Sequence, residues 1–255
     1  VAGGDATAWT LQGPRALVAQ LLTLIPPLLS LGTPLIWAAT NLEQLAGNLE
    51  ADLWQLSLRS LLLALAAAVL AVVTALLLAI AKRWSEARWL QSLTFLAGMG
   101  YAVPGTVLAL ALLLTGGPWQ LAPLVLLLWG YGDRFLAVAK GGLDAALERI
   151  SPSLDEAATG MGFNWQQVLQ RVHLPLLRGP LTVGLLLVFV DTVKELPLTF
   201  ALRPFDFDTL SVRVYQYASD ERLAEALLPA LMILVLGLVA SMALVPSLDQ
   251  ASSKG

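Results

Sequence analysis

The chain lacks cysteine entirely and has a single histidine, His173, among 255 residues. The lack of cysteine excludes disulfides, thiolate metal sites and cysteine nucleophiles, and the lone histidine excludes a metal centre built from several histidines. Charged residues are also scarce, at 13%, and the net charge of −3 offers no basic surface for nucleic acid. The sequence contains no Gly-x-x-x-x-Gly-Lys-Ser/Thr phosphate loop, so nothing in it predicts ATP hydrolysis by this chain.

Apolar residues make up the balance, with 57% hydrophobic residues and a mean hydropathy of +0.74. This composition is too apolar for an ordinary soluble domain, and it predicts an all-α integral membrane protein. Six segments approach the roughly 20 apolar residues needed to cross the bilayer core. The predicted spans are Leu17–Ala39, Leu56–Ile80, Leu93–Leu114, Leu121–Ala139, Leu181–Ala201 and Leu223–Val245.

Two basic segments set the predicted orientation. Lys82, Arg83 and Arg88 lie between the second and third spans and form the most basic short loop, which the positive-inside rule places in the cytoplasm. The segment 140–180, between the fourth and fifth spans, also carries Lys and Arg and falls on the same side. Both termini are therefore predicted to be cytoplasmic.

The segment 140–180 contains helix signals. Ser151 before Pro152 predicts an N-cap followed by proline at the first helical position, and Gly160 and Gly162 predict the end of this first helix. An alternative capping box is offered by the pair Ser153 and Glu156.

A second short helix is predicted after Asn164, as its cap, and up to Pro175, as its end. His173 lies near that end, and we predict a position on the helix surface for it. The whole segment is therefore predicted to be a helix-turn-helix.

The same segment contains a spaced motif: Glu-Ala-Ala, three residues, Gly, nine residues, an aliphatic residue, one residue, Leu-Pro. Its members are Glu156, Ala157, Ala158, Gly162, Val172, Leu174 and Pro175. The pattern resembles the cytoplasmic EAA loop of ABC-importer permeases, with Val172 where Ile is usual. Small alanines let a partner approach closely, and we expect Gly162 to permit a turn that a side chain would obstruct. The alternative is an ordinary amphipathic connector lying on the membrane.

The resemblance implies the type I ABC importer permease fold, with six transmembrane helices and a cytoplasmic coupling loop at 140–180. It implies that a cytoplasmic ABC ATPase dimer, carrying ATP and Mg, docks on the seven motif residues, while this chain binds no cofactor or metal and is no enzyme. A periplasmic substrate-binding protein and a second six-helix half would complete the importer. The implied location is the bacterial inner membrane, as a multi-pass protein.

A second resemblance narrows the cargo. The segments that carry it are Tyr101–Gly105, Asp191–Pro197, Leu202–Leu210, Arg213–Tyr215 and Ala218–Arg222. They are similar to ferric-iron ABC-transporter permeases, which implies transport of ferric iron. Thiamine and phosphonate permeases are related in sequence, so these cargoes or another small solute are the alternative. Ferric permeases are often two fused six-span halves, and the resemblance implies that residues 1–255 form one such half, the C-terminal one, which fits a start at Val1.

Charged residues and helix breakers within the spans are candidates for the translocation path. The candidates are Pro104, Gly105, Asp133, Arg134, Asp191, Lys194 and Glu195. Pro104 and Gly105 should bend or unwind the third span, as a path-lining break or as a packing kink. Asp191 and Lys194 share a helix face and suit an ion pair. Lys194 and Glu195 could either meet the substrate or hold spans together.

The outer segment before the last span supplies a different candidate surface. Its residues Asp206, Asp208, Arg213 and Tyr215 are predicted to face the binding protein. Carboxylates suit Fe(III), but two aspartates after Pro204 are also typical of a turn, and we favour a docking surface over a metal site.

Two other classes of protein are alternatives. A secondary transporter also has broken helices and intramembrane charges, but it would need a coupling-ion site and has no use for an ATPase-docking loop. A membrane-embedded enzyme would need a catalytic constellation, and none can be assembled from these residues.

Overall fold

The computed structural model describes residues 11–43, 52–85 and 87–252, and these form helices and the turns between them, with no strand. Predictions about the start at Val1 and most of the loop between the first two spans lie outside the described residues. The chain separates into two units, residues 1–49 and 50–255. The first unit contains α1 (Pro14–Thr40), a 27-residue helix that includes the first predicted span.

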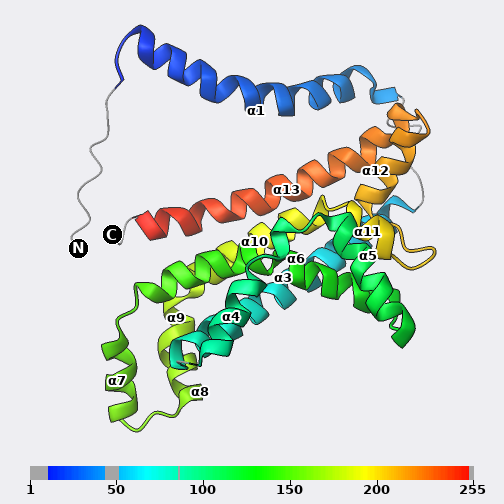
Figure 1. Ribbon diagram of the computed structural model, residues 1–255. Helices are drawn as coiled ribbons and strands as arrows, with labels where there is room; N and C mark the ends of the chain where they lie inside the picture. The colour runs from blue at the N-terminus through cyan, green and yellow to red at the C-terminus, as the bar shows by residue number, and fades with distance from the viewer. Residues whose placement is uncertain (1–10, 44–51, 86, 253–255) are drawn as a thin grey trace. The chain divides into compact units, whose positions relative to one another are not determined.

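The second unit contains the other helices whose bounds the structure describes (Figure 1). In order they are α3 (Leu53–Trp84), α4 (Arg88–Ala97), η1 (Gly100–Ala102), α5 (Gly105–Gly116), η2 (Gly117–Trp119), α6 (Pro123–Glu148), α7 (Pro152–Gly160), α8 (Trp165–Val168), η3 (Leu169–His173), α9 (Leu174–Leu176), α10 (Arg178–Val193), α11 (Pro197–Leu202), α12 (Leu210–Ser219) and α13 (Leu223–Ser252). Within this unit α7, α8 and α9 lie at one end and α11 and α12 at the other (Figure 1).

The core of the second unit forms where α3 packs against α6 and α10. The buried face of α3 is a stripe of alanines: Ala64, Ala67, Ala68, Ala71, Ala75 and Ala79. Their spacing of three and four residues places them on one helix face, and their small side chains let neighbouring backbones approach closely. Gly184 on α10 extends this packing, because a Cβ there would lie 3.6 Å from Cα of Ala139 on α6.

Length and composition mark three of the described helices as membrane spans: α1, α3 and the part of α13 from Leu223 to Ala243. The number rises to five if each of two bent pairs is one span. α6 corresponds to the fourth predicted span and lies in the core, but every 18-residue window of it contains Asp133, Arg134 and Lys140. The six predicted spans are therefore reached only by counting both bent pairs and the charged helix α6.

The third predicted span is broken where Pro104 and Gly105 predict it. Between the helices Arg88–Ala102 and Gly105–Trp119 the chain bends by 119°, and Pro104 is the N-cap of α5. η1 lies so close to α6 that a Cβ on Gly100 would overlap the backbone carbonyl oxygen of Asp133. The break is therefore packed against a neighbouring helix.

The prediction of one continuous helix over Leu181–Ala201 is wrong. α10 ends at Val193, and α11 begins only at Pro197. Proline is favourable in the first turn of a new helix, where its missing N–H is not needed, so Pro197 starts α11 instead of continuing α10. At the other side of the unit α6 continues beyond Ala139 to Glu148, so the short loop helices begin at Pro152.

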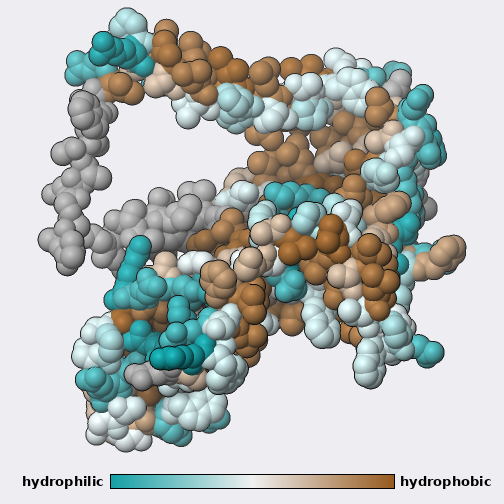
Figure 2. Space-filling model, viewed as in Figure 1, coloured by the Kyte–Doolittle hydropathy of each residue, from teal (hydrophilic) through white to brown (hydrophobic). Residues whose placement is uncertain are grey.

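The surface of the second unit divides by polarity. Figure 2 shows hydrophobic residues along the helices and hydrophilic residues gathered around α7–α9 and beside α12. Many large apolar side chains are exposed along α3, including Leu62, Val73 and Leu77. A surface that is apolar between two polar ends is typical of a multi-pass membrane protein.

Candidate functional site

The first helix of the coupling loop, α7, begins as the sequence predicts. The hydroxyl oxygen of Ser151 accepts a hydrogen bond from the amide of Ser153 at 3.4 Å, and Pro152 is in the first helical turn. Of the two caps considered, the structure has the one at Ser151. The cap lies close after the end of α6 and so sets where the chain turns away from the spans.

The end of α7 depends on the backbone of Gly162, which has a φ of +84°. The amide of Phe163 donates to the carbonyl of Ala158 at 3.1 Å, and the amide of Gly162 donates to that of Thr159 at 2.9 Å. These two bonds form a Schellman motif, which favours glycine at the left-handed position. Nothing lies within 4 Å of a Cβ at Gly162, so this turn disfavours a side chain through its backbone angle and not through a neighbouring atom. The prediction that the turn needs glycine is confirmed.

The second helix begins at a capping box, as predicted from Asn164. The side chain of Asn164 accepts from the amide of Gln167 at 3.0 Å, and the side chain of Gln167 accepts from the amide of Asn164 at 2.9 Å. The prediction that Pro175 ends this helix is wrong. A π-helical turn, η3, precedes Pro175, which then falls in the first turn of α9, where its missing N–H carries little penalty.

The surface of this loop combines motif residues with apolar residues outside the motif. Glu156, Ala157, Gly162 and Pro175 are exposed, Ala158 is buried, and Val172 and Leu174 are half-buried. Large apolar side chains also face outward from the same loop: Leu154, Met161 and Trp165 are 46%, 68% and 61% exposed. Motif matching missed these three, although large apolar residues in a polar loop were the available signal.

His173 is fully buried, so the prediction of a surface position is wrong. Its Nε2 atom lies 3.0 Å from Oδ1 of Asp155 in α7, and its ring meets that of Trp84 edge to face at 5.7 Å. His173 precedes the fifth predicted span, which begins at Leu181, and its segment carries several Gln and Arg residues, so we place the segment outside the membrane although it leads directly into that span. Burial lowers the pKa of His173 below its ordinary value of 6.5, so the ring is neutral at pH 7.

Arg83, at the end of α3, completes this buried cluster. Its Nε donates to Oδ2 of Asp155 at 2.7 Å, and its two terminal nitrogens donate to the carbonyls of Leu147 and Ile150 at 2.9 and 3.0 Å. The sequence predicts Arg83 only as a basic residue that sets orientation. Its partners are remote in the chain, so no local pattern could have identified them.

A cleft of about 300 Å³ brings together most of the predicted path residues. Its lining residues are Tyr101, Arg134, Phe135, Asp191, Lys194, Glu195, Leu196 and Pro197. They come from η1, from α6, and from the break between α10 and α11. Gly105 adjoins the cleft, because a Cβ there would lie 3.1 Å from Oε1 of Glu195.

Within the cleft, Glu195 is bound to its surroundings. Its carboxylate accepts hydrogen bonds from the amides of Leu198 at 3.0 Å and Thr199 at 3.3 Å, so it caps α11. The Nε atom of Arg134 lies 3.8 Å from the same carboxylate. Glu195 is 6% exposed, and of its two predicted roles this geometry favours holding helices together.

Lys194 differs from its neighbour in exposure. Its ammonium forms the predicted ion pair with Asp191 at 2.9 Å, but 62% of its side chain is exposed. The pair therefore presents one positive and one negative group at the wall of the cleft.

Asp133 and Arg134 do not share a site. Arg134 donates to the carbonyl of Val103 at 2.8 Å, just before Pro104, and its guanidinium lies 5.6 Å from the ring centre of Tyr101. Asp133 instead lines a separate cavity of about 440 Å³, together with residues of α3 such as Leu70. The two adjacent side chains of α6 therefore line different cavities.

The outer segment contains internal ion pairs. Arg213 binds Asp52 at 2.8 Å and lies 3.7 Å from Asp208, which also pairs with Arg203. Asp208 and Arg213 are half-buried in this network and are therefore largely occupied by neighbours within the chain.

Other residues of the outer segment face outward. Asp206 is exposed with a φ of +62°, and its carbonyl accepts a hydrogen bond from Arg59 at 2.8 Å. Tyr215 is 43% exposed and packs edge to face on Phe200. Phe205, which the sequence did not single out, is 97% exposed. Among the described residues, no group of three His, Cys, Asp or Glu could hold a metal ion.

Comparison with known proteins decides the family. Residues 71–251 match the family described as binding-protein-dependent transport system inner membrane component. The chain belongs to this family. This permease is 30% identical over 150 residues to the Fe(3+)-transport system permease protein FbpB 2 of Haemophilus influenzae, an alignment that covers 58% of the permease and 29% of that protein.

Other relatives extend the same pattern. The ferric transport system permease protein FbpB of Actinobacillus pleuropneumoniae is 29% identical over 104 residues, covering 37% of this permease and 15% of that protein. The permease thus matches less than a third of the length of the curated relatives.

Solved structures share the fold of this permease. A chain of the MetNI methionine ABC transporter superposes with a TM-score of 0.57 at 17% identity, covering 76% of this permease and 95% of that chain. A chain of a bacterial ABC transporter involved in the import of the acidic polysaccharide alginate gives a TM-score of 0.64 at 14% identity, covering 93% of this permease and 95% of that chain. The all-helical type I ABC importer permease fold predicted from the sequence is confirmed.

Proposed function

We propose that this permease is the translocation subunit of an ATP-driven, binding-protein-dependent importer of ferric iron. The observation that carries the proposal is the 30% identity to a relative named as an Fe(3+)-transport permease. The family assignment supports a transport component rather than an enzyme. The permease would bind no cofactor or metal of its own, and iron would pass through as cargo.

The coupling loop is the proposed dock for a cytoplasmic ABC ATPase dimer, which would supply ATP and Mg. The exposed side chains of Leu154, Met161 and Trp165 offer apolar contact area, and Glu156 beside them offers a charge for orientation. α7 and α8 lie at one end of the second unit, where a partner can reach them (Figure 1). ATP-driven closure of the dimer would then move the loop together with the helices that carry it.

A second six-helix half is the other proposed membrane partner. The short match to longer relatives supports the view that this permease is one half of a tandem protein. We propose that the coupling loop and both termini lie in the cytoplasm, as the basic segments of the sequence predict, and that α11 and α12 lie on the periplasmic side.

On that periplasmic side, the outward-facing residues are the proposed contact for the substrate-binding protein. Phe205, Asp206 and Tyr215 are exposed. Asp208 and Arg213 are half-buried beneath them, and their ion pairs would hold this surface in shape. Lys194 and Asp191 would meet the cargo in the cleft, and Arg134 and Glu195 would fix the cleft's walls.

Uptake of radiolabelled ferric iron tests the proposal. Proteoliposomes would hold the complete permease with its ATPase, with the loaded binding protein on the outer side, and thiamine would be tested in parallel. We expect iron accumulation that needs both ATP and the binding protein, and that stops when the ATPase is replaced by a hydrolysis-deficient variant. ATP-dependent thiamine uptake without iron uptake would overturn the cargo, and uptake without the ATPase would overturn the ATP-driven class.

A further inference from the structure

The helix that docks on the ATPase is attached to the spans by very little apolar packing. Ala158 is the only buried residue of α7. Asp155, in the first turn of this helix, is turned inward, with 17% of its side chain exposed. The angle of α7 therefore depends strongly on the groups that bind this carboxylate.

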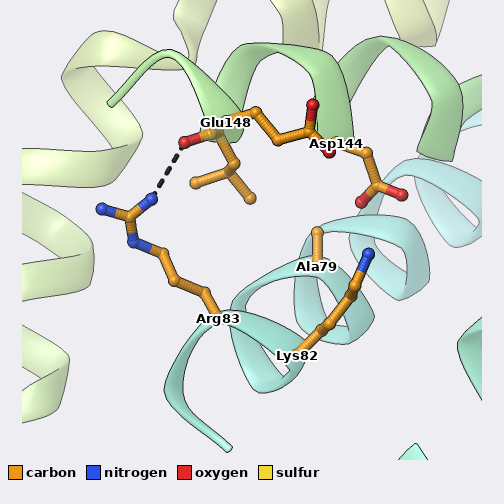
Figure 3. Close-up of a pocket in the computed structure, with 6 residues that line it drawn as sticks. Ala79, Lys82, Arg83, Asp144 and Glu148 are labelled. Carbon is orange, nitrogen blue, oxygen red and sulfur yellow. Dashed lines mark hydrogen bonds between the residues drawn. The ribbon is translucent and has the colours of Figure 1, made fainter. Parts of the chain in front are cut away.

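The first of these groups is Arg83, which joins three helices. Besides Asp155 it binds the carbonyl of Leu147, in the last turn of α6, and the carbonyl of Ile150, two residues after that helix ends. Figure 3 shows Arg83 reaching from α3 towards the carbonyl of Leu147, while Lys82 points the other way, towards Asp144. One side chain thus links the inner ends of α3 and α6 to α7.

The second group is His173, which approaches the other oxygen of the same carboxylate at 3.0 Å from the π-helical turn. Arg83 and Asp155 have opposite charges, so the buried cluster is neutral when His173 is neutral. A protonated ring would add a second cation beside Arg83. Neither ring nitrogen forms a hydrogen bond among the described residues, although Nε2 lies 3.0 Å from Oδ1 of Asp155, so a proton added at Nδ1 would find no acceptor there.

Other charged groups do not balance that cation. On α6, Asp144 pairs with Lys140 at 2.5 Å, and Glu148 is exposed on the cavity beside Arg83. In the loop itself, Arg171 is exposed and stacks over the ring of Phe163. Asp155 is the one carboxylate paired with His173 in the part of the chain that the structure describes, and Arg83 already binds it.

We propose that Arg83, Asp155 and His173 are positioning residues that fix α7 to the inner ends of α3 and α6, and that proton uptake by His173 releases this helix. Acid on the loop side of the membrane would then lower the amount of cargo moved per ATP hydrolysed. The inference rests on the proposed role of α7 as the ATPase dock, and it adds a control of coupling by pH.

The direction of the pH effect follows from the lowered pKa of His173. A detached loop exposes the ring, which then titrates near 6.5, whereas the attached ring resists protonation to a lower pH. The detached state therefore binds more protons below pH 6.5. The attachment of α7 is therefore at full strength above pH 6.5 and weakens as the pH falls below this value.

Hydrogen exchange of the amides in Pro152–Gly160, corrected for intrinsic rates, tests the attachment without transport. In the complete permease, Asp155→Asn should raise their exchange roughly tenfold at pH 7.5, since a charged hydrogen bond contributes at least what a tenfold change in an equilibrium represents. Asp144→Asn is the matched control, because it removes a carboxylate from the same end without touching α7. Equal exchange in the two variants would overturn the positioning role.

The pH profile of cargo imported per ATP hydrolysed tests the role of the proton. In proteoliposomes with ATPase and binding protein, the wild-type ratio should fall several-fold between pH 7.5 and 5.5, roughly one pH unit on either side of the ordinary histidine pKa. His173→Gln cannot gain a charge and should keep a flat ratio, with His173→Asn as a second neutral replacement. A wild-type ratio that stays flat, or a fall that persists in both variants, would overturn the proposal.

Substitution of Arg83 separates charge from packing. Arg83→Lys keeps a cation near Asp155 and should restore part of the coupling that Arg83→Met loses, because Lys can reach fewer of the three acceptors. Equal loss in both would contradict an electrostatic role. Failure of the wild-type complex to couple ATP to uptake would instead reject the proposed function, while the exchange experiment would still test the attachment of α7.

Discussion

At the scale of single residues, Gly162 has a requirement that comes from the backbone alone. Its φ of +84° lies in the left-handed region, yet the space around its Cα is open. Gly160, two residues earlier, also has open space, but it is the last residue of α7 and has no positive φ. Neither glycine is crowded, and only Gly162 has a positive φ. Substituting each in turn therefore isolates the effect of the backbone angle.

We predict that Gly162→Ala weakens the end of α7 by about 1 kcal/mol, the usual order of a left-handed residue's penalty. The loosened helix should raise the ATP hydrolysed per cargo imported, and a bulky residue should raise it further. Gly160→Ala is the control and should be neutral or slightly stabilising, because alanine favours the helix. The prediction fails if both alanine variants change the ratio of hydrolysis to uptake equally.

Local signals predicted the caps of the coupling loop, because each cap joins residues two or three positions apart, as at Ser151 and Asn164. Long-range contacts were not predictable in this way. His173 was expected on a surface, yet it is buried against Asp155 and Trp84, which lie 18 and 89 positions away. Burial in a loop that packs on span ends depends on tertiary structure, and helical periodicity over so few residues cannot show it.

At the scale of elements, the buried face of α3 is made largely of alanine and so lacks bulky side chains. Alanine at positions 67, 68, 71 and 75 brings α6 and α10 close, and the side chains on the opposite face are large. Hydropathy predicted the span but not which face of the helix is buried, because both faces are apolar. Residue size, not polarity, distinguishes the buried face from the outer one.

We predict that Ala71→Leu, at a fully buried position, destabilises the permease by about 1–3 kcal/mol, since added methylene groups must displace packed neighbours. Val73→Leu is the matched control on the same helix, because Val73 is 48% exposed. Thermal unfolding in detergent would compare them, and only Ala71→Leu should lower the midpoint. Equal midpoints would show that the alanine face is not tightly packed.

The break between α10 and α11 was only partly visible in the sequence. Pro197 is a local signal for a new helix, but hydropathy runs on through it, which favoured one long span. The break is stabilised by Glu195, whose carboxylate caps α11 and faces Arg134 on another helix. A charge that is satisfied by tertiary contacts is not distinguishable in sequence from one that awaits a substrate.

At the scale of the whole molecule, the arrangement of polar ends makes a prediction about topology. The chain has no cysteine, so single cysteines can be introduced without removing any. Arg149→Cys at the end of α6 should react with a membrane-impermeant maleimide only from the cytoplasmic side, and Phe205→Cys only from the periplasmic side. Both sites are exposed, so labelling of both from one side would contradict the proposed orientation.

The coupling loop and the fifth span are joined without an intervening flexible segment. The stretch Trp165–Leu176 meets Arg178–Val193 at a bend of 73°. Its 12 residues make an arm of about 18 Å at the usual helical rise, so a shift of about 2 Å at its tip corresponds to a rotation of roughly 6°. In mechanical terms the two segments have the shape of a bell crank: if they move as one body, a small push along the membrane surface at Trp165 would become a tilt of α10 across the bilayer.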